Sequence, residues 1–450
     1  MMGHQPRREA LFHYFNLEDE VPADHLLRLI DHHVDFSFVR DRLQATYSAT
    51  GRPSIDPEVL VRVLLIGYLY GITSERRLME DIRLHLAYRW FTRLGFDQAI
   101  PDHSTVSKNR HGRFRQSGVF REVFEEIVQR CMAAGLVDGR HLSVDGTLVG
   151  ADASTPTRVS RQMHGDAVRV SRTLTAHLTE VEQQNPVAGA RRPARPATVS
   201  PTDPDAAYAT KGGPATFAYY DHYLVDTASR VILDVDATPA RFREEVVAAQ
   251  RMIARTLRRG LRPESLGADK AYGSGEFLAW LLARDIHPHI PVIDRRRQTG
   301  GHFTRDDFHF VPAENVFVCP AGQRLRYRGL SRPTQMYVYC STPTQCRGCS
   351  QKPRCTPGTT RRVTVHWHEP ARQTVRALAG TPAYARSQRA RQLVEGLFGE
   401  LKQQMRLRKV RLRRLWNVAE QFHLAATAQN LKRLVGFLAQ GQSTAAPSTA

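Results

Sequence analysis

The sequence lacks an apolar stretch long enough to cross a membrane. Its longest apolar run, 60–72, spans 13 residues and contains Arg62, whereas a transmembrane helix needs about 20 apolar residues. The first fifteen residues also lack the apolar core of a secretory signal. These absences argue against a membrane-spanning or exported chain. We therefore expect a cytoplasmic protein in which the run at 60–72 forms a buried helix.

Acidic residues and cysteines are also scarce. The 450 residues include 44 Asp and Glu against 64 Lys and Arg, which gives a formal net charge of +20 and a pI near 10.2. A charge this positive favours an acidic polymer as the partner, with nucleic acid ahead of a membrane surface. Only six cysteines are present. In a cytoplasmic chain they are expected to be reduced.

A chain of 450 residues is too long for one ordinary core, so two or three domains are expected. Residues 1–137 follow a helical pattern, with one strong helix beginning near Pro57 and another after Ser74, a good N-cap. Short helices separated by tight turns, with basic residues among them, are compatible with a helix-turn-helix fold. This region is therefore predicted to be a DNA-binding and assembly domain.

From residue 138 the pattern changes to strands. Over 138–291 the expected order is three strands, a helix, a strand, a helix and a strand, with a flexible loop at 185–206. Three antiparallel strands followed by alternating helix and strand predict a mixed α/β sheet. Residues 292–385 are rich in Arg, Thr, Cys and Pro, and a helical pattern returns over 386–438. The sheet domain is thus predicted to be split by a cysteine-rich insertion, with a disordered tail at 439–450.

Acidic residues stand at two strand ends and in the late helical segment. Asp145, followed by Gly146, closes the first expected strand, and Asp269 closes the fourth. If the fourth strand pairs beside the first, the two carboxylates meet. Without a cation they would repel each other, whereas Mg²⁺ would take them as ligands. Glu395, in RQLVEGLFGELKQQM, is the best candidate for a third acid.

The late helical segment also carries cations beside its acid. Arg391 lies four residues before Glu395 and Lys402 lies seven residues after it, so all three share one helix face. That face would offer an acid to a metal and a cation on each side to phosphate. Each acid alone has a simpler explanation: a turn at Asp145 and Gly146, an ion pair with a neighbouring lysine, or an exposed helix acid. Only the combination of three acids is specific.

Several segments together resemble the motifs of bacterial insertion-sequence transposases with an Asp-Asp-Glu triad. These segments are SVDGTLVGADAS, TDPDAAY, LGADKAYGSGEF and RQLVEGLFGELKQQMRLRKVRLR, and in the N-terminal region GRPSIDPEVLVRVLLIGYLYGITSERRL and IPDHSTVSKNR. The resemblance spans most of the chain. It implies a ribonuclease H-like catalytic fold flanked by helices. It also implies that Asp145, Asp269 and Glu395 are catalytic residues and ligands of Mg²⁺ or Mn²⁺.

The resemblance implies metal-dependent cleavage of DNA at element ends, followed by joining of the freed 3′-OH to a target strand. It further implies a homodimer on DNA and a bacterial, nucleoid-associated protein. The family's Arg and Lys around the Glu are matched by Arg391 and Lys402. The Tyr that precedes the Glu in the family falls at position 388, which is Gln388 in this sequence. Tyr384 lies one helical turn earlier. Two alternatives are a domesticated nuclease that cuts without joining and a DNA-binding regulator with a decayed site.

Five of the six cysteines lie between residues 319 and 355, and Cys346 and Cys349 form a C-x-x-C pair. Four thiolates around Zn²⁺ would stabilise a region too poor in apolar residues to fold alone. Similar transposases carry this pattern before the acid helix. The resemblance implies that the ligands of a structural zinc are Cys319, Cys346, Cys349 and Cys355. Reduced cysteines without a metal are the alternative.

The segment 402–418 carries seven Lys and Arg and no acid. A basic segment this dense suits a phosphate backbone, although a solvated helix face would have the same composition. The candidate DNA contacts here are Arg391, Lys402, Arg406, Arg408, Lys409, Arg411, Arg413 and Arg414. A short basic helix in the N-terminal region adds His103, Lys108 and Arg110.

Overall fold

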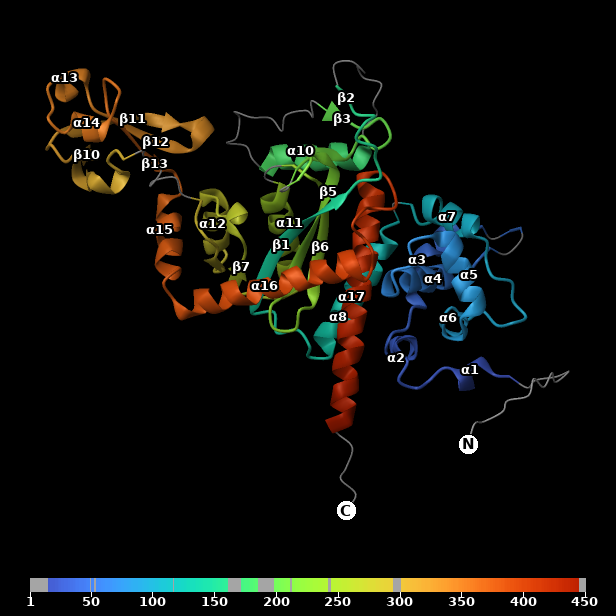
Figure 1. Ribbon diagram of the computed structural model, residues 1–450. Helices are drawn as coiled ribbons and strands as arrows, with labels where there is room; N and C mark the ends of the chain where they lie inside the picture. The colour runs from blue at the N-terminus through green and yellow to red at the C-terminus, as the bar shows by residue number, and fades with distance from the viewer. Residues whose placement is uncertain are drawn as a thin grey trace, which may run out of the picture. The chain divides into compact units, whose positions relative to one another are not determined.

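The computed structural model describes residues 15–444 except 49, 52–53, 116, 161–170, 185–197, 211–212, 242–243 and 294–300. Most of the loop expected at 185–206, and the end of the tail expected at 439–450, lie outside the described residues. The chain divides into two compact units (Figure 1). The helical unit comprises Met1–Leu136, Leu401–Leu407 and His423–Ala450, and the second unit comprises Val137–Glu400 and Arg408–Phe422. No helix in the described ranges is long and apolar enough to cross a bilayer.

The helical unit contains α1 (Leu17–Glu20), α2 (Leu26–His33), α3 (Phe38–Leu43), α4 (Pro57–Leu69), α5 (Glu75–Leu84), α6 (Leu86–Phe91), α7 (His103–His111) and α8 (Val119–Ala133). The apolar run is α4, which Asp56 caps, and it is buried as expected. Arg62 within it is fully buried and pairs with Glu58 at 2.8 Å and with Asp31, so its charge is compensated. Ser74 caps α5 as expected.

The second unit is built around a mixed sheet. Its strands are β1 (His141–Gly150), β4 (Ala207–Ala209), β5 (Thr216–Asp226), β6 (Ile232–Pro239), β7 (Ser265–Gly267) and β8 (His287–His289). β1 is antiparallel to β5 and parallel to β7, β5 is antiparallel to β4 and β6, and β7 is parallel to β8. Helix α11 (Glu244–Arg258) follows β6, and α12 (Gly275–Leu282) follows β7. The predicted mixed α/β arrangement is confirmed, and β7 pairs beside β1 as the acid pair requires.

The first strand is longer than expected. β1 continues to Gly150, so Asp145 lies inside the strand, opposite Tyr223 of β5. The prediction that Asp145 closes the strand was wrong, and Gly146 forms no turn. A Cβ at Gly146 would lie 2.7 Å from Nδ1 of His222, a distance that side chains do not tolerate. Glycine therefore allows the His222 ring to approach β1 closely.

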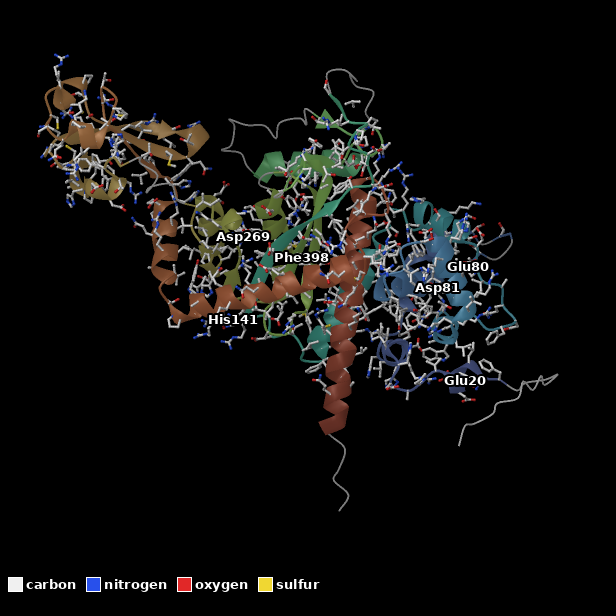
Figure 2. The ribbon with its side chains drawn as sticks, in the orientation of Figure 1. Glu20, Glu80, Asp81, His141, Asp269 and Phe398 are labelled. Carbon is white, nitrogen blue, oxygen red and sulfur yellow. The ribbon has the colours of Figure 1, made fainter. Side chains whose placement is uncertain are left out.

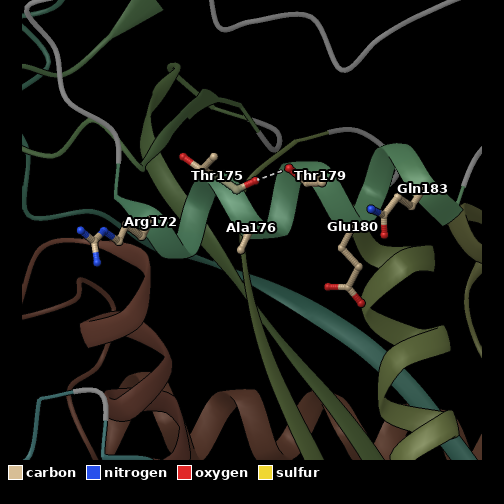
Figure 3. A pocket seen from close by; sticks show the side chains of 6 residues that line it. All are labelled: Arg172, Thr175, Ala176, Thr179, Glu180 and Gln183. Atoms are coloured by element: carbon tan, nitrogen blue, oxygen red, sulfur yellow. Dashed lines mark hydrogen bonds between the residues drawn. The ribbon is translucent and has the colours of Figure 1, made fainter.

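Buried charges join α11 to β6. Arg255 donates to both oxygens of Asp234, and Arg251 donates to both oxygens of Asp236. Burial opposes ionisation of Asp236, but Arg251 and Arg255 hold the pKa of this carboxyl below its ordinary value. Arg251 also donates to Glu180, which Figure 3 shows projecting from α10 (Arg172–Gln184). The network fixes α10 and α11 against the sheet.

A second, antiparallel sheet follows the first in sequence, with the order β13-β12-β11-β10-β9. Its strands are β9 (His309–Val311), β10 (Val316–Val318), β11 (Arg324–Ser331), β12 (Met336–Cys340) and β13 (Arg362–His366). Two short helices, α13 (Pro343–Cys346) and α14 (Lys352–Cys355), lie between β12 and β13. The buried core comprises Phe308, Phe317, Leu325, Tyr339, Cys355 and Val363. Strands this short produce no long periodic signal, which is why no element is predicted here from the sequence.

Three helices complete the chain: α15 (Glu369–Leu378), α16 (Pro382–Gln403) and α17 (Leu415–Thr444). The helical pattern expected over 386–438 is therefore divided between two helices. Residues 439–444, expected in a disordered tail, are the end of α17.

The basic segment between α16 and α17 is irregular instead of helical. The backbone N–H of Gly150 donates to the carbonyl of Arg408 at 3.0 Å, and the N–H of Val410 donates to Gly150 at 2.8 Å. The segment thus bridges to the end of β1 at Lys409. Arg406 and Arg414 have φ values of 55° and 78°, which interrupt a right-handed helix.

Candidate active site

Asp145 presents a half-buried carboxylate from β1. Its Oδ1 accepts a hydrogen bond from the N–H of Gly146 at 2.8 Å, and its Oδ2 lies 3.3 Å from Nη1 of Arg391 on α16. The Asp145 side chain is 15 % exposed and the Arg391 side chain 18 %. A strand acid and a cation 246 residues later in the chain are therefore in direct contact.

Glu395 is joined to the same arginine. Its Oε1 lies 3.9 Å from Nη2 of Arg391, and its side chain is 64 % exposed. The guanidinium group therefore bridges the carboxylates of Asp145 and Glu395. A cation in this position offsets the repulsion between two acids that approach each other.

Asp269 lies two residues after β7 and caps the short 3-10 helix η3 (Lys270–Tyr272). Its Oδ1 accepts a hydrogen bond from the N–H of Ala271 at 2.8 Å, which fixes the direction of the carboxylate. Within the described ranges, no ion pair joins it to Lys270, so the simple pairing considered from the sequence is not found. Figure 2 labels Asp269 beside the sheet.

A buried tyrosine lies among the acids. Tyr272 is fully buried, and a Cβ at Gly146 would lie 3.7 Å from its hydroxyl. Burial raises the pKa of Tyr272 well above its usual value, and the negative charges of Glu245, Asp145 and Asp269 raise it further. Asp145 and Asp269 therefore act on one hydroxyl, together with an acid from the first turn of α11. Glu245 has no distinctive sequence signal, because it lies in an ordinary amphipathic helix.

Helix α16 is held to the sheet by aromatic packing and by one amide. Phe398, labelled in Figure 2, stacks on Tyr223 with ring centroids 4.8 Å apart. The side-chain amide of Gln388 donates to the carbonyl of Ala268 at 3.1 Å and to the carbonyl of His289. Gln388 therefore ties α16 to the residue directly before Asp269. Tyr384 packs edge-on against His289 instead.

Replacing Gln388 with Leu is expected to lower the free energy of unfolding by about 2 kcal/mol, because two carbonyls lose their donor. The matched control is Gln392→Leu on the same helix, since Gln392 is exposed and its loss should change stability by less than about 0.5 kcal/mol. Urea denaturation measures both. Equal stability of the two variants would show that the amide does not hold α16.

The donor set of the acids suits a hard divalent cation. Asp145, Asp269 and Glu395 offer only carboxylate oxygens, and Mg²⁺ commonly takes one or two carboxylates plus water or phosphate. In the described part of the chain, no three His, Cys, Asp or Glu side chains form a group arranged to hold a metal ion. The arrangement instead gives pairs: Asp145 with Glu395 across Arg391, and Asp145 with Asp269 around Tyr272. The carboxylate oxygens suit Mg²⁺ chemically, and Arg391 lies between Asp145 and Glu395 in this structure.

The cysteines predicted as zinc ligands line one cavity. Its walls include Cys319, Cys346, Cys349 and Cys355, and they do not include Cys340. Burial raises the pKa of the Cys355 thiol, and the other three thiols of the cavity act on it as well. The four thiols are thus neighbours, in agreement with the sequence pattern. In this structure the four thiols do not form a group arranged to hold a metal ion.

The side chains predicted to contact DNA differ in their exposure and in whether they already form an ion pair within the protein. Lys409 and Arg413 both lie 3.0 Å from Asp152, and Arg414 lies 3.7 Å from Asp205. Arg110 is 9 % exposed and pairs with Glu75 at 2.6 Å. Exposed cations are Arg406, Arg408, Lys409, Arg413 and Lys108, and the partly buried ones are Lys402, Arg411, Arg414, Arg391 and His103. Arg110 is therefore the candidate least able to reach DNA.

Two buried acids of the TDPDAAY motif hold the start of α17. Asp203 accepts hydrogen bonds from the N–H of Arg414 and from the hydroxyl of Tyr219, and Asp205 accepts one from the N–H of Leu415. Burial raises the pKa of Asp203 to about 6, against these hydrogen bonds. The motif therefore has a structural role that the sequence did not reveal.

The raised pKa of Asp203 predicts a pH-dependent difference from Asp203→Asn. The folded protein holds this proton up to about pH 6, whereas the unfolded chain releases it near pH 4. The stability contributed by the proton is complete below about pH 4 and is lost as the pH rises through about 6. Melting temperatures of wild type minus variant should fall between pH 4 and 7. A constant difference would contradict the assignment.

Comparisons with known proteins match two parts of the chain to transposase families. A model described as Transposase domain (DUF772) matches residues 15–112, and one described as Transposase DDE domain matches residues 318–435. The second match includes Glu395, whereas Asp145 and Asp269 lie outside both. A cryo-EM structure of a piggyBac transposase synaptic complex with hairpin DNA is 10% identical, with a TM-score of 0.34, covering 93% of this chain and 75% of that one. The family matches support a DDE transposase.

Proposed function

We propose that this protein is a DNA transposase that cuts DNA at element ends and joins the freed 3′-OH to target DNA. The observation that carries the proposal is that Arg391 lies within ion-pair distance of two acids from remote segments, Asp145 of β1 and Glu395 of α16. Asp145 contacts Glu395 through Arg391, and it shares the surroundings of the Tyr272 hydroxyl with Asp269. The two transposase family matches support the same class.

The strand order supports a ribonuclease H-like catalytic fold. Three antiparallel strands, β6, β5 and β1, continue into the parallel strands β7 and β8. Parallel strands connected by a helix direct their carboxyl ends to one edge. The site acids come from β1, from the end of β7 and from α16, so three remote segments supply one carboxylate each.

Asp145, Asp269 and Glu395 are the residues that would hold the divalent ions. Bound Mg²⁺ would lower the pKa of a water molecule and stabilise charge on the leaving oxygen. The protein residues fix the geometry: Gly146 and Ala271 each donate a backbone hydrogen bond that orients one carboxylate. Arg391 carries a guanidinium group that can pair with a phosphate oxygen. Each DNA end needs such a site, so the active form is a homodimer on DNA.

Structural zinc is the second cofactor of the proposal. The four cysteines that the family resemblance implies as ligands, Cys319, Cys346, Cys349 and Cys355, all line one cavity, which supports this part of the proposal. Thiolates are the ligands that structural zinc prefers. Metal bound there would stabilise the β9–β13 sheet, whose main apolar cluster is small.

The test is strand transfer by the full-length protein. Purified protein is incubated with Mg²⁺, labelled DNA that carries the sequences flanking its gene, and a plasmid target. Joined products would support a transposase, and cleavage without joining would favour the nuclease of the same fold. DNA binding with neither product, in Mg²⁺ and in Mn²⁺, would favour the regulator with a decayed site and contradict the proposal.

A further inference from the structure

The two faces of the β9–β13 sheet differ in the side chains they present: one is apolar and faces the core, and the other carries arginines. One face packs Phe317, Leu325, Tyr339 and Val363 into the buried core. Because side chains alternate along a strand, the residues between them occupy the other face. The strand register aligns four of these residues in one row across the sheet: Val316, Arg326, Cys340 and Arg362.

The row carries positive charge without compensation. Arg326 and Arg362 are exposed, and neither side chain has an ion-pair or hydrogen-bond partner among the described residues. Arg324, on the same face, pairs with Glu314 at 2.6 Å. None of the five strands contains Asp or Glu. The face is therefore basic, and it lacks the acids that would neutralise it from within.

The surface fits a phosphate backbone better than a protein. Two strand spacings separate Arg326 from Arg362, so their backbones lie about 10 Å apart. Duplex DNA carries a negative charge about every 1.7 Å of helix axis, so several phosphates fall within that span. A protein partner needs an apolar anchor as well. Of the valines on this face, Val316 and Val338 are buried at 8% and 9% exposure and Val311 and Val318 are half-buried, so among the described residues no large apolar side chain stands out from it.

We infer that this face of the β9–β13 sheet binds the DNA backbone through Arg326 and Arg362, without reading its sequence. Each guanidinium group presents donors in a planar fork that matches a phosphate. The choice of DNA as the nucleic acid rests on the proposed function. The two arginines extend the DNA-binding surface to residues outside the acid helix and the basic segment.

The experiment compares two double variants of equal net charge in the full-length protein. Arg326→Gln/Arg362→Gln alters the face, whereas Arg230→Gln/Arg347→Gln removes two exposed cations from turns. Affinity for a mixed-sequence duplex of about 30 base pairs is measured by fluorescence anisotropy between about 50 and 200 mM salt. The face variant should bind about tenfold more weakly, and its slope of log K against log salt should be smaller by about 2. The control variant should match wild type within about twofold.

Equal slopes for the two double variants would overturn the inference, including the case in which the face binds an acidic protein. A third variant, Arg326→Lys/Arg362→Lys, keeps the charge and should keep the slope, which separates charge from packing if the glutamine variant unfolds. Wild-type protein that binds no duplex would contradict the proposed function and this inference together. Wild-type protein that joins DNA, with an unchanged slope in the face variant, would contradict the inference alone.

Discussion

Strand transfer is expected to fall at least about 1,000-fold when Asp145, Asp269 or Glu395 is replaced by the matching amide. An amide keeps the shape of the side chain but removes the charge that would hold a divalent ion. Metal ions contribute several kcal/mol to phosphodiester chemistry, and each 1.36 kcal/mol is a factor of ten in rate. Joined product is quantified on gels with Mg²⁺, and DNA binding is measured in parallel and should persist.

The control for this prediction is Glu400→Gln on the same helix. Glu400 lies five residues after Glu395, which places it roughly 140° around the helix at about 100° per residue. Its replacement should leave strand transfer within about threefold of wild type, since its carboxylate points away from the helix face that carries Arg391 and Glu395. Full activity of any one of the three variants would show that the replaced acid is not part of the catalytic site.

Loss of the cysteine cavity is expected to unfold the second sheet. Cys346→Ser/Cys349→Ser removes two of the four thiols that line the cavity. A structural zinc stabilises a small domain by about 10 kcal/mol or more, so its loss should outweigh the net stability of a sheet with so small a core. Metal analysis should show one zinc per wild-type chain and none in the variant. Hydrogen exchange should show lost protection over β9–β13.

Cys340→Ser is the matched control, because Cys340 lies in β12 and does not line the cavity. This variant should keep its zinc and its protection against exchange. Protection retained by the double variant, in protein that contains no zinc, would show that the sheet is stable with reduced cysteines. The alternative considered from the sequence would then hold.

The sequence located the acids on the correct elements because their signals are local. An apolar strand, a following carboxylate and a helix with Arg391 and Glu395 at a spacing of four are visible in short windows. The pairing of β7 beside β1 could be stated only as a condition, since it depends on contacts between residues more than 120 positions apart.

Other features had no local signal at all. The extension of β1 beyond Asp145 depends on pairing with β5, and an Asp-Gly step favours a turn when read alone. The family resemblance presents Gln388 as a missing tyrosine, whereas its amide donates to the carbonyls of Ala268, just after β7, and of His289 in β8. The sequence predicts a helix for the basic segment, because it carries no local sign of the bridge to Gly150. That bridge is a tertiary contact. Tertiary contacts override local propensity in each case.

The most direct test of the central claim exchanges a hard ligand for a soft one. In Asp145→Cys and Asp269→Cys, a thiolate replaces a carboxylate, and thiolates bind Mg²⁺ poorly but accept softer ions such as Mn²⁺. Strand transfer by both variants should be lost in Mg²⁺ and partly recovered in Mn²⁺, with Asp→Ala variants inactive in both. Undiminished strand transfer in Mg²⁺ by either cysteine variant would contradict the claim that these carboxylates hold the catalytic ions.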